Sequence, residues 1–271
     1  MYRCKTLIVT EKETASSEKR LSICLRSNGF SFSEVSLSGV LLTFGEAEGM
    51  HAGSMTVAMA DVKAFFASVG IRPLGYAAME LVVLSDHSTW VPDELYSPSA
   101  HRQYLKLVGS DATTIMATPC KKLGATAVYA ASDAIATAFK VALPGLVVMN
   151  QHVKLASVGL ERRSQDHPLL LAHWREGVID FAAFRDGRYI YGNTVAYSSD
   201  SEAQFHTIEV LKSFGLENNG TELLMCGEVG RERFALLRPY FPQATLFTGL
   251  HTSFLNPAFK TLHTYRNALI L

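Results

Sequence analysis

The chain has 271 residues, enough for one large domain or two modest ones, and either arrangement allows a real hydrophobic core. Lys plus Arg number 25 and Asp plus Glu number 25, so the sequence lacks the basic excess that is typical of proteins bound to nucleic acid or to anionic membranes. Hydrophobic residues at 48 % and charged residues at 18 % exclude a disordered chain. We therefore expect a globular protein without a nucleic-acid partner.

No membrane helix or secretion signal is predicted. The longest stretch without Lys, Arg, Asp or Glu, residues 239–259, contains several prolines, Gly249 and His251, which are incompatible with a spanning helix. The N-terminal residues MYRCKTLIVTEKE acquire charge at once and lack a long apolar segment. We expect a cytoplasmic protein that does not insert into a membrane.

Common metal and catalytic signatures are missing from the sequence. The four cysteines have no Cys-x-x-Cys spacing and predict reduced thiols, and the nine histidines form no His-Glu-x-x-His pattern. There is also no Walker A loop, no Gly-x-Ser-x-Gly and no Gly-x-Gly-x-x-Gly after a strand. The sequence therefore predicts no metal site and names no catalytic residue.

An internal repeat is the strongest signal in the chain. Residues 21–45 align without a gap on residues 169–193. The aligned glycines are Gly29 with Gly177 and Gly39 with Gly187. A polar residue precedes each of them, and pairs such as Asn-Gly and Asp-Gly supply the positive φ of a tight hairpin. Each copy therefore predicts a three-stranded antiparallel meander.

The same succession of elements follows both meanders. A helix that ends at a glycine comes first, then a short apolar strand, then a second helix. The predicted ranges are 55–70, 80–84 and 99–107 in the first half, and 205–215, 222–226 and 231–240 in the second. This pattern favours a duplicated α/β protein built from two β-β-β-α-β-α units; an unrelated α+β protein with two meanders is the alternative.

The first half carries additional predicted elements, namely a strand at 125–129 and helices at 132–143 and 151–163. We place the domain boundary so that residues 1–166 form the first lobe and 167–271 the second. Residues 255–271 are a segment that such a fold allows to return to the first lobe.

Two such units facing each other across a cleft resemble the acetate and sugar kinase, heat-shock and actin superfamily. The segments LSICLRSNGFSFSEVS and STWVPDELYSPSAHRQYL are also similar to a bacterial family known as a domain of unknown function with an actin-like ATPase fold. The resemblance implies a two-lobed actin-like (ribonuclease H-like) fold, and it implies no activity.

The resemblance also allows the phosphate-binding positions to be compared. In active members of the superfamily, the first hairpin of each half carries an Asp-x-Gly-Thr type motif that orients Mg²⁺ and holds phosphates. Here Cys24 or Leu25 stands at the position of the acid in the first half, and Ala172 or His173 in the second. The resemblance therefore implies phosphate-binding motifs that have lost their acids.

Five residues remain as candidates for contacts in the cleft. Arg26 and Ser27 follow the first strand of the first meander, where an anion would lie, and Asp86 follows a predicted central strand. Asp180 is a candidate for a residual metal ligand, unless it simply faces solvent. Gly227 matches one glycine of the nucleoside-binding pair of the superfamily, although a strand-to-helix turn explains it equally.

The segment from Trp90 to Tyr96 places two large aromatic residues around a proline turn. It is expected either to pack onto the first domain, which we favour, or to form a partner surface.

These observations favour a non-catalytic scaffold, regulatory or ligand-binding protein without a cofactor, with a protein partner or a small molecule in the cleft. The alternative is an active ATPase or small-molecule kinase that takes its acids from Asp86, Asp180 or Glu228 and uses ATP with Mg²⁺. A sugar or nucleotide binder without turnover is a third class.

Overall fold

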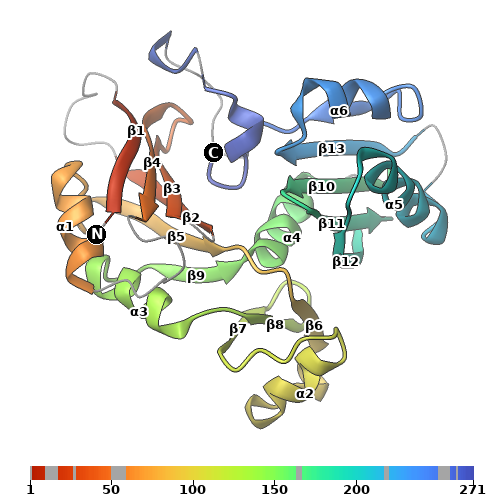
Figure 1. The fold of residues 1–271 in the computed structure, drawn as a ribbon, viewed down its shortest axis with the longest axis horizontal. Helices are drawn as coiled ribbons and strands as arrows, with labels where there is room; N and C mark the ends of the chain where they lie inside the picture. Colours follow the sequence, from red (N-terminus) through yellow and green to blue (C-terminus); the bar gives the residue numbers. More distant parts are fainter. Residues whose placement is uncertain are drawn as a thin grey trace.

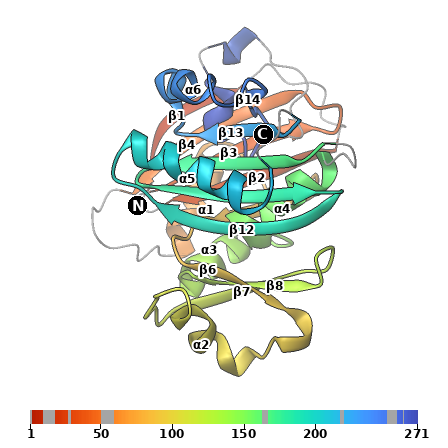
Figure 2. The ribbon, with the colours of Figure 1, turned by 90° about the vertical axis from the view of Figure 1, so that its right-hand side faces the viewer.

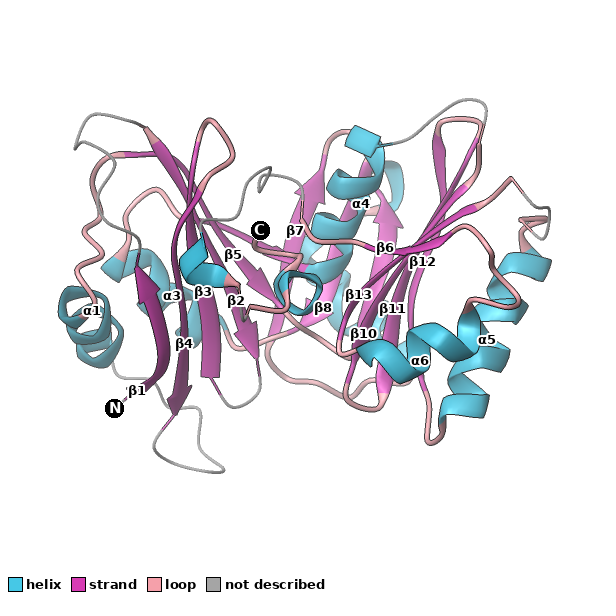
Figure 3. Ribbon diagram, turned by 90° about the horizontal axis from the view of Figure 1, so that it is seen from above, coloured by secondary structure: helices cyan, strands magenta, loops and turns pink. Residues whose placement is uncertain are grey.

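The computed structural model describes residues 2–9, 18–26, 29–49, 59–162, 167–216, 220–249, 257–260 and 262–271. Two large β-sheets lie side by side, each with helices on its outer face, and a small third sheet lies below them (Figures 1 and 3). Of the residues named above, Ser27 and His251 lie outside the described residues.

The first lobe contains a six-stranded sheet in the order β1-β4-β3-β2-β5-β9. Its elements are β1 (Tyr2–Val9), β2 (Lys19–Arg26), β3 (Gly29–Ser36), β4 (Leu41–Gly49), α1 (Met59–Ser68), β5 (Tyr76–Val83), α3 (Asp133–Ala142) and β9 (Val147–Asn150). Helices α1 and α3 cover the outer face, where Phe30 and Phe32 of β3 pack against Phe65, Phe66 and Phe139.

The second lobe contains a five-stranded sheet in the order β12-β11-β10-β13-β14. Its elements are β10 (Leu169–Arg175), β11 (Val178–Arg185), β12 (Arg188–Ala196), α5 (Asp200–Ser213), β13 (Glu222–Gly227), α6 (Gly230–Leu237) and β14 (Ala244–Leu246). Helices α5 and α6 cover the outer face around Trp174 and Phe181.

The two sheets repeat the same strand order, since β4-β3-β2-β5-β9 corresponds to β12-β11-β10-β13-β14. In both, the first strand of the meander pairs in parallel with the strand after the first helix. One assignment from the sequence was wrong. The helix predicted at 99–107 is α2 (His101–Lys106), which lies outside the first sheet, and α3 precedes β9 as α6 precedes β14.

A small antiparallel sheet is inserted between β5 and α3 of the first lobe. It contains β6 (Ser88–Pro92), β7 (Ile115–Cys120) and β8 (Ala125–Ala130) in the order β6-β8-β7, with α2 packed on it. The strand predicted at 125–129 is its central strand. The segment from Trp90 to Tyr96 packs in two directions. Tyr96 contacts the apolar cluster of the small sheet, within residues 1–166, as we favoured, whereas the ring of Trp90 in β6 lies 5.7 Å from that of Tyr189 in the second sheet. Figure 2 shows the small sheet below β12 of the second sheet.

The hairpin glycines have the predicted role at three of the four positions. Gly39, Gly177 and Gly187 have φ of 85°, 72° and 68°. Gly29 differs, because it is the first residue of β3 rather than a turn residue with positive φ. A Cβ at this position would lie 2.0 Å from the carbonyl oxygen of Ala47, so close strand packing explains this glycine.

The inner faces of the sheets are covered by segments that cross between the lobes. Helix α4 (Gln151–Arg162) follows β9 directly and packs with Leu155 and Val158 on the inner face of the second sheet. The C-terminal segment returns to the inner face of the first sheet, where Phe259 and Ile270 pack against Phe44. Helix α4 and the C-terminal segment therefore fill the space between the inner faces of the two sheets.

Cys24, Cys120 and Cys226 are buried, Cys4 is exposed, and all four are free thiols, as predicted. Within the described residues, every helix is too short or too polar to traverse a lipid bilayer.

The close contact between α4 and the second sheet predicts the effect of one substitution. A Cβ at Gly159 would lie 2.0 Å from the ring of Phe184, which is buried. Gly159→Ala should therefore lower the free energy of unfolding by about 1–3 kcal/mol, although alanine favours a helix by about 1 kcal/mol over glycine. Urea denaturation measures the difference.

Ser157→Ala, in the same helix, is the matched control and should change stability by less than about 0.5 kcal/mol. If Gly159→Ala were as stable as the wild-type protein, the packing of α4 on the sheet would be looser than described here.

Candidate functional site

A cavity of about 1370 Å³ lies between the two sheets. Its walls come from the ends of β2, β5, β10 and β13, from the start of α6 and from the C-terminal segment. The polar residues that line it include Arg26, Ser31, Ser85, Asp86, His87, Ser132, His173, Arg175, Glu176, Ser198, Asp200, Glu228, Glu232, Arg233, Arg266 and Asn267. The carboxyl ends of parallel strands thus meet at one site, as in other α/β proteins.

Asp180 of β11 lies directly beneath this cavity with no exposed surface. Its Oδ1 accepts hydrogen bonds from Arg175 Nη2 at 2.9 Å, Thr194 Oγ1 at 2.7 Å and Gln151 Nε2 at 3.2 Å. Its Oδ2 accepts from Arg175 Nε at 2.8 Å and from His173 Nδ1 at 3.0 Å. All of its hydrogen-bonding capacity is thus used within the chain.

The surroundings of Asp180 fix its charge. Burial alone would raise the pKa of this carboxyl, but the hydrogen bond from His173 and the positive charge of Arg175 lower the pKa well below its ordinary value. Asp180 is therefore ionised at neutral pH, and its charge is neutralised by Arg175.

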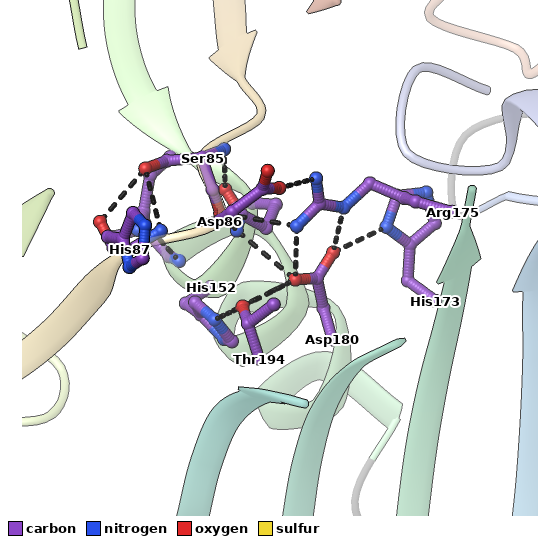
Figure 4. Close-up of polar contacts among 11 residues, drawn as sticks. Ser85, Asp86, His87, His152, His173, Arg175, Asp180 and Thr194 are labelled. Atoms are coloured by element: carbon purple, nitrogen blue, oxygen red, sulfur yellow. Dashed lines mark hydrogen bonds and ion pairs between the residues drawn. The ribbon is translucent and has the colours of Figure 1, made fainter. Parts of the chain in front are cut away.

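Arg175 connects the two lobes (Figure 4). On one side, its guanidinium is bound to Asp180, and both residues belong to the second sheet. On the opposite side, Nη1 donates to Asp86 Oδ1 at 2.5 Å and Nη2 donates to the carbonyl oxygen of Ser85 at 3.2 Å, both in the segment that follows β5. One arginine therefore bridges a buried carboxylate of one lobe and a partly exposed carboxylate of the other.

The start of α4 supports this bridge from the side. The Gln151 amide accepts from the backbone N–H of Ser85 and donates both to the carbonyl oxygen of Ser85 and to Asp180. His152 is bonded through Nε2 to Thr194 Oγ1 at 2.9 Å, and Thr194 in turn donates to Asp180. Burial, which outweighs the attraction of Asp180, lowers the pKa of His152 to about 4.

Three of the residues predicted from the sequence line the cavity. Arg26 donates to Asn267 Oδ1 at 3.0 Å, and Asp86 is the exposed partner of Arg175. Gly227 has φ of 82°, and a Cβ there would lie 2.1 Å from the carbonyl oxygen of Trp174. The approach of β13 to β10 thus explains this glycine without a ligand. Ser27 lies outside the described residues.

Asp180 lies neither in the cleft as a metal ligand nor at the surface, the two positions that the sequence suggested. It neither faces solvent nor lines the cavity, because it is enclosed by its donors; in this arrangement its carboxylate is not available to a metal. Among the described residues, no group of three or more His, Cys, Asp or Glu side chains is arranged to hold a metal ion.

Sequence reasoning missed Arg175 and Gln151. A signal for Arg175 was present, because in the predicted hairpin His173 lies opposite Asp180, and Arg175 is on the same face as His173. No comparable signal exists for Gln151, which reaches the site from the start of α4, whereas Ser85 directly precedes the predicted Asp86.

Comparison with known proteins gives the fold and a family. The profile of a family described as "Protein of unknown function (DUF3822)" matches residues 10–244. A protein of unknown function with an actin-like ATPase fold from Bacteroides thetaiotaomicron has a similar structure, with a TM-score of 0.65, 17 % identity and coverage of 88 % of this chain and 93 % of that chain. A structure of the PilM-PilN type IV pilus biogenesis complex is similar at a TM-score of 0.56 and 11 % identity, covering 93 % and 95 % of the two chains. No curated protein matches the chain.

The first prediction for this site concerns the buried ion pair. Asp180→Ala should lower the free energy of unfolding by about 3–5 kcal/mol, because it leaves the Arg175 guanidinium largely buried with only its exposed partner, Asp86. Chemical denaturation of both proteins measures the change.

Asp186→Asn is the matched control, since Asp186 is an exposed turn residue with φ of 53°, which asparagine tolerates. A loss of less than about 1 kcal/mol in Asp180→Ala, comparable to that of a surface pair, would contradict the role given to the ion pair.

The second prediction concerns pH. The unfolded chain protonates His152 below its ordinary pKa of about 6.5, whereas the folded chain does so only near pH 4, so this residue makes the protein less stable as the pH falls between these values. From pH 7 to pH 5 the loss should be about 2 kcal/mol. The Asp180 carboxyl does not contribute in this range, because its lowered pKa affects stability only below about pH 4.

His152→Gln, which keeps a donor for Thr194, should remove this part of the pH dependence in urea denaturation at pH 5, 6 and 7. Parallel curves for the two proteins would show that His152 titrates normally in the folded state.

Proposed function

The chain belongs to the DUF3822 family and has an actin-like ATPase fold. From this premise we propose that it is a non-catalytic scaffold or regulatory protein in which Arg175 bridges the two sides of the interlobe cleft. The observation that carries the proposal is the position of Arg175 between Asp86 and Asp180. In an actin-like ATPase, carboxylates at the cleft serve a metal; here the guanidinium of Arg175 forms hydrogen bonds with both of them.

Metal binding at this position would require Arg175 to leave. A cation between Asp86 and Asp180 would have to displace a guanidinium that makes hydrogen bonds to both carboxylates and to the Ser85 carbonyl oxygen. Asp180 would also have to give up donors from Thr194 and Gln151. Loss of this network in a buried site is costly, and this supports a cleft without Mg²⁺.

The other arginines of the cavity also have acidic partners within the chain, although that of Arg26 is distant, with Nη1 4.0 Å from Glu46 Oε1. Arg233 Nε lies 2.7 Å from Asp200 Oδ1, and Arg266 Nε lies 3.6 Å from Glu228 Oε2. A triphosphate without its metal would compete with these acids for each guanidinium. The internal pairing therefore favours a protein that does not turn over nucleotide.

We further propose that residues 1–166 and 167–271 act as two lobes of a cytoplasmic bacterial protein, tied by Arg175 and by the C-terminal segment. The solved PilM-PilN complex is an example of an actin-like structure found together with a protein partner. A role through protein binding is the function we favour for this chain.

One observation favours the alternative, an ATPase or small-molecule kinase. Asp86 and Asp180 approach the same guanidinium from opposite lobes, so two carboxylates do converge in the cleft. Under this alternative a nucleotide with Mg²⁺ would open the arginine bridge.

Titration calorimetry with Mg-ATP on the full chain tests the proposal, together with an assay of phosphate release. We expect neither binding heat nor hydrolysis, and no thermal shift, whereas a bound nucleotide at a hundredfold its Kd would stabilise the fold by ~2.7 kcal/mol. Tight binding with hydrolysis that Asp86→Asn abolishes and Asp186→Asn preserves would establish the alternative. Screening sugars and nucleotides by thermal shift detects a binder without turnover.

A further inference from the structure

A second cavity lies outside the interlobe cleft, between the small sheet and the second lobe. It has a volume of about 460 Å³, within the range of ligand pockets in proteins. We call it the β12 groove. It is lined by Ser88, Thr89, Trp90, Val108, Leu123, Ala125, Tyr189, Ile190, Tyr191, Gly192 and Asn193.

The groove follows the edges of two strands. Five consecutive residues of β12, from Tyr189 to Asn193, line it, and so do three consecutive residues of β6. Because neighbouring side chains of a strand point to opposite faces, such runs show that the groove runs along the strand edge and not over one face of a sheet. In the part of the chain that the structure describes, β12 pairs only with β11, and β6 only with β8. An edge of this kind presents backbone donors and acceptors to an added strand.

The walls of the groove combine apolar and polar groups in similar proportion, and the apolar part is formed by a few large side chains. The rings of Trp90 and Tyr189 meet at 5.7 Å with an interplanar angle of 70°. Val108 and Leu123 line the side formed by the small sheet, and next to Val108 the side chain of Leu107 is 84 % exposed. Apolar side chains of an occupant would therefore be buried here, with an exposed apolar residue beside them.

The lining residues have basic neighbours in the chain. Lys106, Lys121, Lys122 and Arg188 lie within two residues of the groove lining and are exposed. None of them forms an ion pair with an acid among the residues described.

The acids near the groove are mostly bound already. Asp86 is paired with Arg175 and Asp186 with Arg185, and Asp93 accepts a hydrogen bond from Thr126. Asp111, three residues beyond Val108, is the remaining acid close to the lining in sequence. The chain neighbours of the lining residues that lack an acidic or hydrogen-bonded partner are therefore predominantly basic.

We propose that the β12 groove binds an extended peptide segment of a protein partner, in which acidic residues flank a short apolar core. The peptide lies along the free edge of β12, its apolar side chains contact Trp90, Tyr189 and Leu123, and its acids face the four basic residues. This inference rests on the proposed function, because it names the partner class for a non-catalytic protein.

The experiment uses the full chain and a displayed library of random peptides. We expect the selected sequences to carry Asp or Glu on both sides of apolar residues. For a synthesised selected peptide, fluorescence polarisation should give a Kd about tenfold higher for Lys121→Glu/Lys122→Glu than for the wild-type protein, and the affinity should fall with added salt.

The matched control is Lys63→Glu/Lys140→Glu, which reverses the same number of exposed charges on α1 and α3 at the outer face of the first lobe. It should bind the peptide with unchanged Kd. Amide hydrogen exchange should also slow in residues 191–193 when the peptide is added. Thermal melting of each variant establishes that it is folded.

Three outcomes overturn the proposal: selection of sequences without acidic residues, equal affinity of both double variants for the selected peptide, or binding of a single-stranded oligonucleotide that the peptide does not displace. A dimer of this chain that Lys121→Glu/Lys122→Glu dissociates would identify a second copy as the occupant, which also overturns it. These results are independent of the Mg-ATP titration, so failure of this inference and failure of the proposed function are distinguishable.

Discussion

The ion pair between Asp180 and Arg175 is the interaction on which the centre of this molecule depends. A carboxylate without solvent contact is tolerated only when donors replace its lost water, and five hydrogen bonds from the chain do so here. Because Arg175 is fixed by this buried partner, its remaining N–H groups are directed at Ser85 and Asp86 of the other lobe. The buried Asp180–Arg175 pair thus fixes the geometry of the contact between Arg175 and Asp86 of the other lobe.

The two repeated sheets make this meeting possible. In each, the first strand of the meander pairs in parallel with the strand that follows the first helix, so that the carboxyl ends of β2, β5, β10 and β13 all reach the cavity. At this position the side chains of Arg175 and Asp180, from β10 and β11, meet Ser85 and Asp86 of the segment after β5, and they form hydrogen bonds with one another.

The inserted small sheet gives the molecule a surface that does not depend on the cleft. Its strand β6 begins only two residues after Asp86, so one short segment contacts the second lobe twice, through Arg175 and through Tyr189. The cleft contacts are charged and internally paired, whereas the β12 groove has a mixed apolar and polar lining whose chain neighbours include basic residues without an ion pair among the residues described. This contrast is the physical basis for assigning internal stability to the first region and partner binding to the second.

Much of the fold follows from local patterns in the sequence. Hairpin glycines such as Gly39 and Gly187 and the apolar periodicity of α1 and α5 are properties of short segments, and they predicted the meanders and the helices after them. The short strands β6, β7 and β9 escaped prediction because a few residues carry little periodicity. The position of α2 escaped it because a helix pattern does not reveal which sheet the helix covers.

The sequence by itself determined which residues occupy the predicted strand ends, and with the family resemblance it predicted that Cys24 or Leu25 and Ala172 or His173 stand where a phosphate site would have acids. Tertiary structure decided which side chains meet in the cleft. Asp86 and Arg175 are 89 positions apart, and Gln151 enters from a third element, so their meeting depends on the crossing of the chain between lobes. Pairwise contacts over such separations arise from the packing of whole sheets, and for this reason no local pattern of residues encodes them.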